Sequence, residues 1–200
     1  SGTGYLNYNI NVHSVDAPGA FQQEGARLHK YEIVAGNNKG TTPDDFPIFR
    51  YADALMIKAE CLLRLGRDKD TAAELVTEVR KRSFPNAVAK ATRTVAQLEG
   101  PSVYAYGHEE YNGTPDADGN VKCTDWSGFK STNEGGSDIE LGGLLDDLGW
   151  EFCAELHRRQ DLRRFKLKDG RNVWNGKSWF CKDATSDTTY DVFAIPSSAM

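Results

Sequence analysis

Two pairs of polar residues within residues 151–157 have spacings that could support chemistry. Cys153 and His157 are four residues apart, so on one helix face they could supply two metal ligands, or a thiol and its base. A zinc site would need further Cys or His ligands at suitable spacing, and Cys153 falls on an apolar stripe. Glu151 and Glu155 have the residue type of glycosidase carboxylates, but such a pair must face each other across the substrate. Neighbouring carboxylates on one helix more often pair with arginines, so we expect ion pairs here.

The stretch "DADGN" at 116–120 resembles the start of a calcium loop, with carboxylate and amide side chains at alternate positions. The pattern then fails, because Val121 stands where a glycine is needed and Ser127 replaces the bidentate glutamate. A tight polar turn is the better interpretation. The sequence also lacks a glycine-rich phosphate loop, a G-x-S-x-G elbow and an HExxH motif. We therefore expect no enzyme activity, no metal and no cofactor.

Residues 86–136 show little periodicity and many glycines, and a loop this long is usually functional or disordered. Aromatic faces beside planar polar groups suit a sugar ring, which stacks its C–H face and donates directional hydrogen bonds. We predict that five aromatic residues of this loop bind a glycan: Tyr104, Tyr106, Tyr111, Trp126 and Phe129. Trp174 and Trp179 are weaker candidates for the same role. In the alternative interpretation, the rings only pin a long loop to the helices.

Length and charge limit the class of protein. Two hundred residues suit one domain, so we expect a single domain over 1–200. A net charge of −5 argues against a nucleic-acid partner, since no basic stripe is present to release counterions. Acidic residues interrupt the dense basic run near residue 160, which predicts internal ion pairing of Arg158, Arg159, Arg163 and Arg164. No stretch approaches the roughly 20 apolar residues of a membrane-spanning helix.

The four cysteines show no CxxC spacing and define no disulfide framework. Cys61 and Cys153 have apolar helical neighbours, which predicts that both are buried. Cys123 and Cys181 lie in loop-like stretches that contain tryptophan, so a disulfide between them is an open alternative.

A helix is predicted over "RYADALMIKAECLLRL" at 50–65, followed by a left-handed C-terminal glycine at Gly66. Its predicted buried face is Tyr51, Leu55, Ala59, Leu62 and Leu63, with Lys58, Glu60 and Arg64 facing outward. A second helix is expected to begin at a capping box formed by Thr71 and Glu74, and to bury Ala72, Val76 and Val79. Two amphipathic helices joined by about four residues should pack antiparallel, as in a tetratricopeptide unit.

A third helix is predicted to start at a second capping box, Ser137 to Glu140. Its apolar stripe is Leu141, Leu144, Leu145, Leu148, Phe152 and Leu156. Glycines at 142, 143 and 149 each lower the stability of this helix by about 1 kcal/mol relative to alanine. A short helix through "DLRRFKL", a hairpin around Asn175-Gly176 and strands at 27–34 and 190–200 complete the expected elements. The predicted fold is mainly α: a tetratricopeptide-like helical hairpin plus a long C-terminal helix, with long irregular loops and a few short strands.

Two segments resemble signatures of the SusD/RagB family. The first is "DDFPIFRYADALMIKAECLLRLGRDKDTAAELVTEVRKRS", beginning at residue 44, and the second is "LDDLGWEFCAELHRRQDLRRF" at 145–165. The matching positions of the second segment are Glu151, Phe152, Glu155, His157, Arg158, Asp161, Leu162 and Arg164. The sequence departs from that pattern at Asp147-Leu148, at Arg159-Gln160 and at Leu156, where the family has a glycine. The closing "YDVFAIPSSAM" resembles the family's terminal segment.

This resemblance implies a cell-surface lipoprotein of the Bacteroidetes outer membrane that takes part in nutrient uptake and polysaccharide utilisation. Family members bind glycans, cover a SusC-like TonB-dependent transporter and are not enzymes. The chain would be the C-terminal portion of such a protein, with the lipid anchor outside it. The matched residues would be scaffold positions, namely Arg50, Tyr51, Glu60, Arg80, Glu155, Arg158 and Asp161, because the family's sugar site lies in variable loops.

Taken together, we predict non-catalytic glycan binding and delivery to a SusC-like transporter. The acidic balance favours neutral sugars over sulfated or uronate-rich ones, which would be repelled. The alternative is a helical scaffold that only docks the transporter, with the ligand site in the missing N-terminal part.

Overall fold

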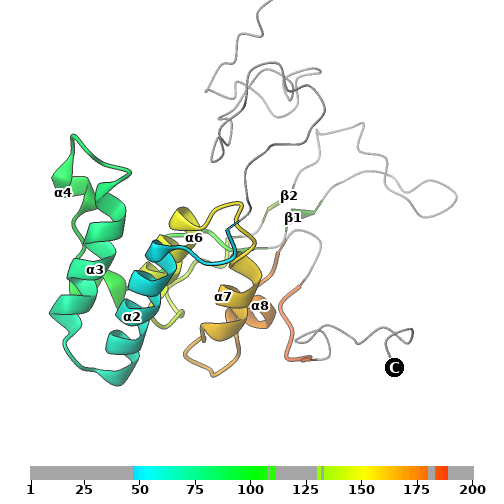
Figure 1. Ribbon diagram of the computed structural model, residues 1–200. Coiled ribbons are helices and arrows are strands. Elements are labelled where there is room, and N and C mark those ends of the chain that lie inside the picture. The colour runs from blue at the N-terminus through cyan, green and yellow to red at the C-terminus, as the bar shows by residue number, and fades with distance from the viewer. Residues whose placement is uncertain (1–46, 108, 111–129, 132, 180–182, 189–200) are drawn as a thin grey trace, which may run out of the picture. The chain divides into compact units, whose positions relative to one another are not determined.

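The protein is described by a computed structural model covering residues 47–107, 109–110, 130–131, 133–179 and 183–188. From Phe49 onward these residues belong to one compact unit, which comprises Phe49–Glu110 and Lys130–Met200. The unit contains short and long helices but, among the described residues, only a two-stranded β-ladder (Figure 1). The predicted mainly α class is confirmed.

The predicted helical hairpin is present as α2 (Tyr51–Leu65) and α3 (Lys69–Lys81), which lie side by side in Figure 1. Gly66 ends α2 with φ 64, the left-handed conformation that glycine adopts without a Cβ penalty. Its N–H donates to Leu63 O, and Arg67 N–H donates to Leu62 O, so two orphan helix carbonyls are satisfied. The hairpin turn is therefore the one that the sequence indicates.

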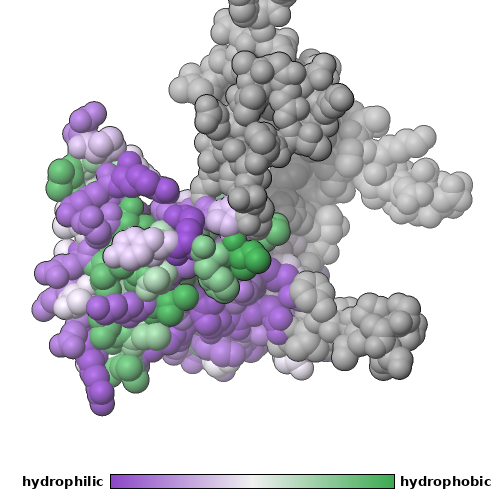
Figure 2. Space-filling model, viewed as in Figure 1, coloured by the Kyte–Doolittle hydropathy of each residue, from purple (hydrophilic) through white to green (hydrophobic). Residues whose placement is uncertain are grey.

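The buried face of α2 is rotated from the predicted one. Met56, Ala59 and Leu63 are buried, but Tyr51 is 78% exposed and the predicted outward residue Glu60 is only 6% exposed. Hydropathy assigns charged residues to solvent, whereas this helix buries a carboxylate that pairs with Arg64 of the same helix and with Arg164 of another segment. On α3 the predicted face, Ala72, Val76 and Val79, is buried as expected. Figure 2 shows hydrophobic and hydrophilic residues interspersed on the visible surface over α2 and α3.

The predicted capping boxes at Thr71 and Ser137 are both wrong. Helix α3 begins two residues before Thr71, after Asp68 in a left-handed conformation. Helix α6 (Gly142–Glu151) begins after Leu141, well beyond Ser137. A capping box does form at Thr94, within residues read from sequence as irregular, where α4 (Val88–Ala91) and α5 (Val95–Leu98) occur. Hydrophobic periodicity could not detect helices of one turn.

The prediction of one long C-terminal helix is also wrong, because this part of the chain forms two separate helices. Helix α6 ends at Glu151, and α7 (Arg158–Arg164) follows a turn in which Ala154 and Leu156 have φ values of 63 and 65. Left-handed residues cannot continue a right-handed helix. The break turns Leu156 outward, to 84% exposure, although the apolar stripe placed it in the core.

The glycines at the start of α6 are needed for close packing. A Cβ built on Gly143 would overlap the carbonyl oxygen of Gln97, and one built on Gly142 would overlap the backbone nitrogen of Ser102. The first turn of α6 thus lies directly against the end of α5 and the segment that follows it.

The hairpin predicted at Asn175-Gly176 is instead α8 (Val173–Gly176), with the side chain of Asn172 accepting from Asn175 N. Cys61 and Cys153 are exposed, contrary to expectation, because the α2 face is rotated and the long helix is broken. The ladder consists of β1 (Glu109–Glu110) and β2 (Lys130–Ser131), which are antiparallel. The predicted strands at 27–34 and 190–200, the "DADGN" turn and the Cys123–Cys181 pair lie outside the described residues.

Candidate functional site

Four aromatic residues proposed from sequence meet in one cluster, which we call the aromatic cluster: Tyr104, Tyr106, Trp174 and Trp179. The ring centroids of Tyr104 and Tyr106 are 5.6 Å apart, and Tyr106 meets Trp179 edge-on at 5.4 Å. Trp179 stacks on Trp174 at 5.7 Å. The structure thus joins the 104–106 segment to the tryptophans near the C-terminus. Tyr111, Trp126 and Phe129 lie outside the described residues.

Backbone hydrogen bonds hold the segment that carries the two tyrosines. Ser102 N–H donates to Gly136 O, and Gly107 N–H donates to Ser178 O. Between them, Tyr106 O accepts from Glu134 N–H. The short helix α8 places Trp174, whose carbonyl accepts from the indole N–H of Trp179. These bonds fix the cluster without a regular sheet.

Tyr106 is the structural centre of the cluster. Its side chain is 5% exposed, and its hydroxyl accepts a hydrogen bond from Nη2 of Arg158 at 3.2 Å. Burial raises the pKa of Tyr106, because an ionised phenolate would be desolvated. The Ser102 hydroxyl beneath it donates to the buried carboxylate of Asp146 at 2.6 Å, which completes a polar network inside the core. Because the Tyr106 ring is buried, it is not part of an exposed surface on which a sugar could stack.

Tyr104 is the exposed edge of the cluster. It is 53% exposed, and the guanidinium carbon of Arg158 lies 5.5 Å from its ring centroid. Trp174 is partly buried, with the guanidinium carbon of Arg159 at 5.8 Å from its ring. The cluster therefore offers one accessible tyrosine face that is backed by ordered rings and bordered by two arginines. Sequence reasoning proposed the rings but not the arginines, which it assigned only to ion pairing.

The expected ion pairs of Glu151 and Glu155 are confirmed. Arg50 Nη1 donates to Glu151 at 2.6 Å, and Arg50 Nε donates to Glu155 at 2.7 Å. Arg82 also pairs with Glu151 at 2.7 Å. These carboxylates are occupied by cations, so they do not form an open catalytic pair.

A second set of ion pairs surrounds α6. Asp147, 2% exposed, accepts from Arg80 and from Arg93. Burial raises the pKa of Asp147, although both arginines oppose the rise. No sequence signal identified the role of Arg93.

Cys153 and His157 do not form the ligand pair considered from their spacing. Both lie in or beside the turn between α6 and α7, so they do not share a helix face. The His157 ring stacks on Phe152 at 4.7 Å, and its Nδ1 lies 3.5 Å from Asp53 Oδ1. Within the described part of the chain, no group of three or more His, Cys, Asp or Glu side chains is placed to hold a metal.

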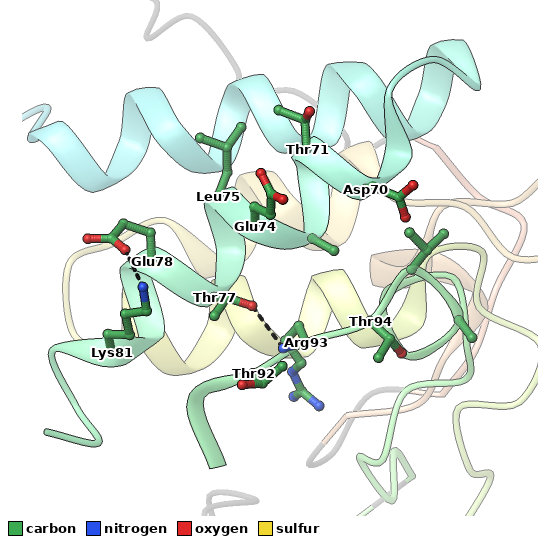
Figure 3. Close-up of a pocket in the computed structure, with 13 residues that line it drawn as sticks. Asp70, Thr71, Glu74, Leu75, Thr77, Glu78, Lys81, Thr92, Arg93 and Thr94 are labelled. Atoms are coloured by element: carbon green, nitrogen blue, oxygen red, sulfur yellow. Dashed lines mark hydrogen bonds and ion pairs between the residues drawn. The ribbon is translucent and has the colours of Figure 1, made fainter. Parts of the chain in front are cut away.

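A cavity of about 960 Å³ lies between α3 and residues 92–96 (Figure 3). Its polar lining includes Thr71, Glu74 and Thr77 of α3, and Thr77 accepts from Arg93 N–H at 2.9 Å. None of the described residues that line it is aromatic. This cavity can accept and donate hydrogen bonds but offers no ring for stacking, so the aromatic cluster is the better candidate for a sugar.

Comparison with known proteins identifies the family of the chain. A model of the SusD family matches residues 1–198, nearly the whole chain. The chain belongs to the SusD family. SusD-like protein P38 of Formosa agariphila is 44% identical to this SusD-family chain over 85 residues, which are 40% of the chain and 16% of that relative. No solved structure matches the chain.

The SusD-family chain therefore aligns with a small part of its longer relative. In the residues that the structure describes, helices are too short or too polar to cross a bilayer.

Proposed function

We propose that this SusD-family chain captures a glycan at the cell surface and delivers it, uncleaved, to a SusC-like TonB-dependent transporter of the outer membrane. The family supports a role in glycan-binding nutrient uptake. The observation that carries the proposal for this chain is the aromatic cluster with its exposed Tyr104. A half-exposed aromatic ring held by a rigid scaffold suits sugar stacking, since little conformational entropy is lost on binding.

The long loop adds a second line of support. Strands β1 and β2 pair its two ends, with Glu109 opposite Ser131 and Glu110 opposite Lys130. Tyr104 and Tyr106 precede β1 by a few residues, so the segment between the two strands begins beside these two rings in sequence. We propose that Tyr104 contributes to the glycan site from the aromatic cluster, and the sequence-based proposal that Tyr111, Trp126 and Phe129 bind glycan is kept for residues outside the described part of the chain. The buried ring of Tyr106 supports that site without touching the ligand.

The alternative function is a helical scaffold that only docks the transporter. The burial of Tyr106 favours it, because this ring serves packing, as would be expected if the rings merely pin the loop. Both functions are non-catalytic, and both would place the protein at the outer membrane through a lipid anchor in the intact protein.

A glycan-array screen of the protein and of Tyr104→Ala tests the proposal, with thermal melts of both. Tyr51→Ala is the matched control, because Tyr51 is also an exposed tyrosine but lies on α2. We expect Tyr104→Ala to lose binding with an unchanged melt, while Tyr51→Ala keeps it. Equal binding by all three proteins would exclude Tyr104 from the site. No binding by the folded parent would favour the scaffold.

Delivery without cleavage is tested on the bound glycan. After prolonged incubation, chromatography should recover the oligosaccharide at its original length. Shorter products that persist after repurification would contradict a non-catalytic role.

A further inference from the structure

Arg158, the first residue of α7, connects helix α6 to both tyrosines of the aromatic cluster. The basic run near residue 160 predicts ion pairing for it, but two of its nitrogens bond to other groups. Nη1 donates to the carbonyl oxygen of Leu145 at 2.9 Å, and Nη2 donates to the hydroxyl of Tyr106 at 3.2 Å. The carbon of the same guanidinium lies 5.5 Å from the ring centroid of Tyr104. One planar group thus contacts a helix, the buried ring and the exposed ring.

The backbone and the ring of Tyr104 are held by different groups. Its N–H donates to the Ser102 hydroxyl at 3.2 Å, which fixes where the side chain leaves the chain. The direction of a half-exposed ring depends on its rotamer, and a rotamer is selected by what the ring contacts. Here the ring lies against Tyr106, with the two planes at 46°, and beside the guanidinium of Arg158. Arg158 therefore contacts both rings whose relative orientation it would set.

Gly149, within α6, provides the space that this guanidinium occupies. A Cβ built on Gly149 would lie 2.8 Å from Nη1, 3.2 Å from Cζ and 3.7 Å from Nε of Arg158. The three nearest atoms thus all belong to one guanidinium. A real Cβ essentially never approaches another heavy atom as closely as 2.8 Å. Any side chain at position 149 would displace the end of Arg158, which is flexible, rather than the backbone.

We infer that Arg158, seated on Gly149, is a positioning residue of the glycan site, which holds the Tyr104 ring in the orientation that receives a sugar. This inference rests on the proposed function in taking a glycan as the ligand of Tyr104. Arg158 acts through Tyr104 and Tyr106 and need not touch the ligand. A ring that is already held in its bound orientation loses less entropy when the ligand binds. Substitutions beneath the cluster should therefore change the affinity for the glycan.

Gly149→Ala separates this role from a contribution to stability. Alanine is the better helix former, and the overlap that it creates is with the flexible end of a side chain. The melting temperature should therefore stay the same or rise. Because the guanidinium of Arg158 must move, we expect glycan binding to weaken by up to about tenfold, the cost of ordering one side chain on binding. Weaker binding by a variant as stable as the parent would not come from general destabilisation.

Arg158→Lys tests the geometry of the guanidinium. Lysine keeps the positive charge but not the planar fork that bonds in two directions at once, so binding should weaken as in Gly149→Ala. Arg164→Ala is the matched control, because this arginine of the same helix pairs with Glu60 and its loss should lower stability. We expect that control to keep the affinity of the parent. Equal weakening in Arg164→Ala would mean that any disturbance of α7 lowers affinity, which would overturn a specific role for Arg158.

The experiment has one readout for binding and one for the ring itself. Titration calorimetry measures the Kd of the parent and of each variant for neutral hexasaccharides, namely maltohexaose, cellohexaose, xylohexaose and laminarihexaose. Fluorine NMR of protein labelled with fluorotyrosine reports on the ring without any ligand, and the Tyr104 resonance is the one that Tyr104→Phe lacks. We expect this resonance to shift in Gly149→Ala and in Arg158→Lys, and to stay in place in Arg164→Ala.

Failure of this inference and failure of the proposed function are distinguishable. Binding that depends on Tyr104 but is as tight in Gly149→Ala and Arg158→Lys as in the parent overturns the positioning role and leaves the proposed function intact. If the parent binds no hexasaccharide, or binds without Tyr104, the result counts against the proposed function. The fluorine spectra then decide: an unshifted Tyr104 resonance in both variants overturns the inference, and a shifted one supports the positioning of this ring by Arg158.

Discussion

Asp147 joins two arginines from different segments, and the stability of the unit should be sensitive to this one residue. It accepts from Arg80 of α3 and from Arg93 of the segment between α4 and α5. Removing one member of a buried ion pair leaves uncompensated charge in the core. Both guanidinium groups also lie near the Trp150 ring, at 5.6 and 5.4 Å.

Asp147→Ala should therefore lower the free energy of unfolding by about 3–5 kcal/mol, measured by urea denaturation. Glu78→Ala is the control, because it removes an exposed pair with Lys81, whose contribution should be at most about 1 kcal/mol. Similar losses in the two variants would contradict a structural role for Asp147.

The folding stability of the unit should depend on pH through the carboxylate of Glu60. Burial by itself would raise the pKa of Glu60, but the hydrogen bonds and charges of Arg164 and Arg64 outweigh it, so the pKa is lowered. A lowered folded-state pKa contributes stability above the unfolded value of about 4.3, and that contribution is lost as pH falls through the folded pKa.

We expect Glu60→Gln to be less stable than the parent by about 1.5–3 kcal/mol at pH 7. The gap between the two denaturation curves should begin to shrink below about pH 4.3, where Glu60 of the unfolded chain takes up a proton, and should close as pH falls through the lower pKa of the folded state. A gap that stays constant across the acid range would contradict the ion-pair origin of the shift.

At the scale of elements, the turn between α6 and α7 contains a strained residue. Leu156 has φ 65 and is 84% exposed. A left-handed conformation costs a non-glycine residue roughly 1–2 kcal/mol. Leu156→Gly should therefore raise the free energy of unfolding by up to about 1 kcal/mol, since glycine also gains freedom in the unfolded chain. Thermal melts check this, and a lower melting temperature would show that Leu156 makes contacts that offset its strain.

Where α6 packs on α5, glycine is the residue that stability requires, and replacing Gly143 should be unfavourable. A methyl group at Gly143 would overlap Gln97 O, and backbone cannot move aside as a flexible side chain could. Gly143→Ala should destabilise the unit by about 1–3 kcal/mol despite the better helix propensity of alanine. Gly170→Ala is a useful contrast, because that glycine has open space around it and its cost should come only from its φ of 89. A stabilised Gly143→Ala would mean that propensity outweighs packing.

At the scale of the whole unit, ion pairs connect the two segments that resemble family signatures. Arg50 comes from the first segment and Glu155 from the second, and they share two hydrogen bonds of 2.7 and 3.0 Å. A double-mutant cycle of Arg50→Ala and Glu155→Ala should give a coupling energy of about 0.5–3 kcal/mol in chemical denaturation. Additive losses would mean that the pair contributes nothing beyond its separate contacts.

The sequence predicted those features that depend on local pattern. The α2–α3 hairpin followed from helical periodicity and from Gly66, whose chemistry is read within a few residues. The burial of Glu60 could not be predicted from hydropathy, because it depends on a pair with the distant Arg164. The exposure of Cys61 goes with the same rotation of the buried face of α2. The break after α6 could not be predicted from the stripe, since leucine at a left-handed position gives no local signal.

The sequence predicted which aromatic residues take part in the candidate site, but it did not predict how they are arranged in space. Tyr104 and Trp174 were both proposed for sugar binding, yet nothing in their sequence neighbourhoods indicated that they belong to one cluster. Their meeting depends on backbone bonds such as that from Gly107 to Ser178, which join segments far apart in the chain.

The β1–β2 ladder has a consequence for how such a protein can acquire new ligands. Because the ladder closes residues 111–129 at their base, the length of that segment can change with little penalty, about 0.6 kcal/mol for each doubling. Segments of other lengths and sequences could therefore be inserted between β1 and β2 while the two strands keep their pairing.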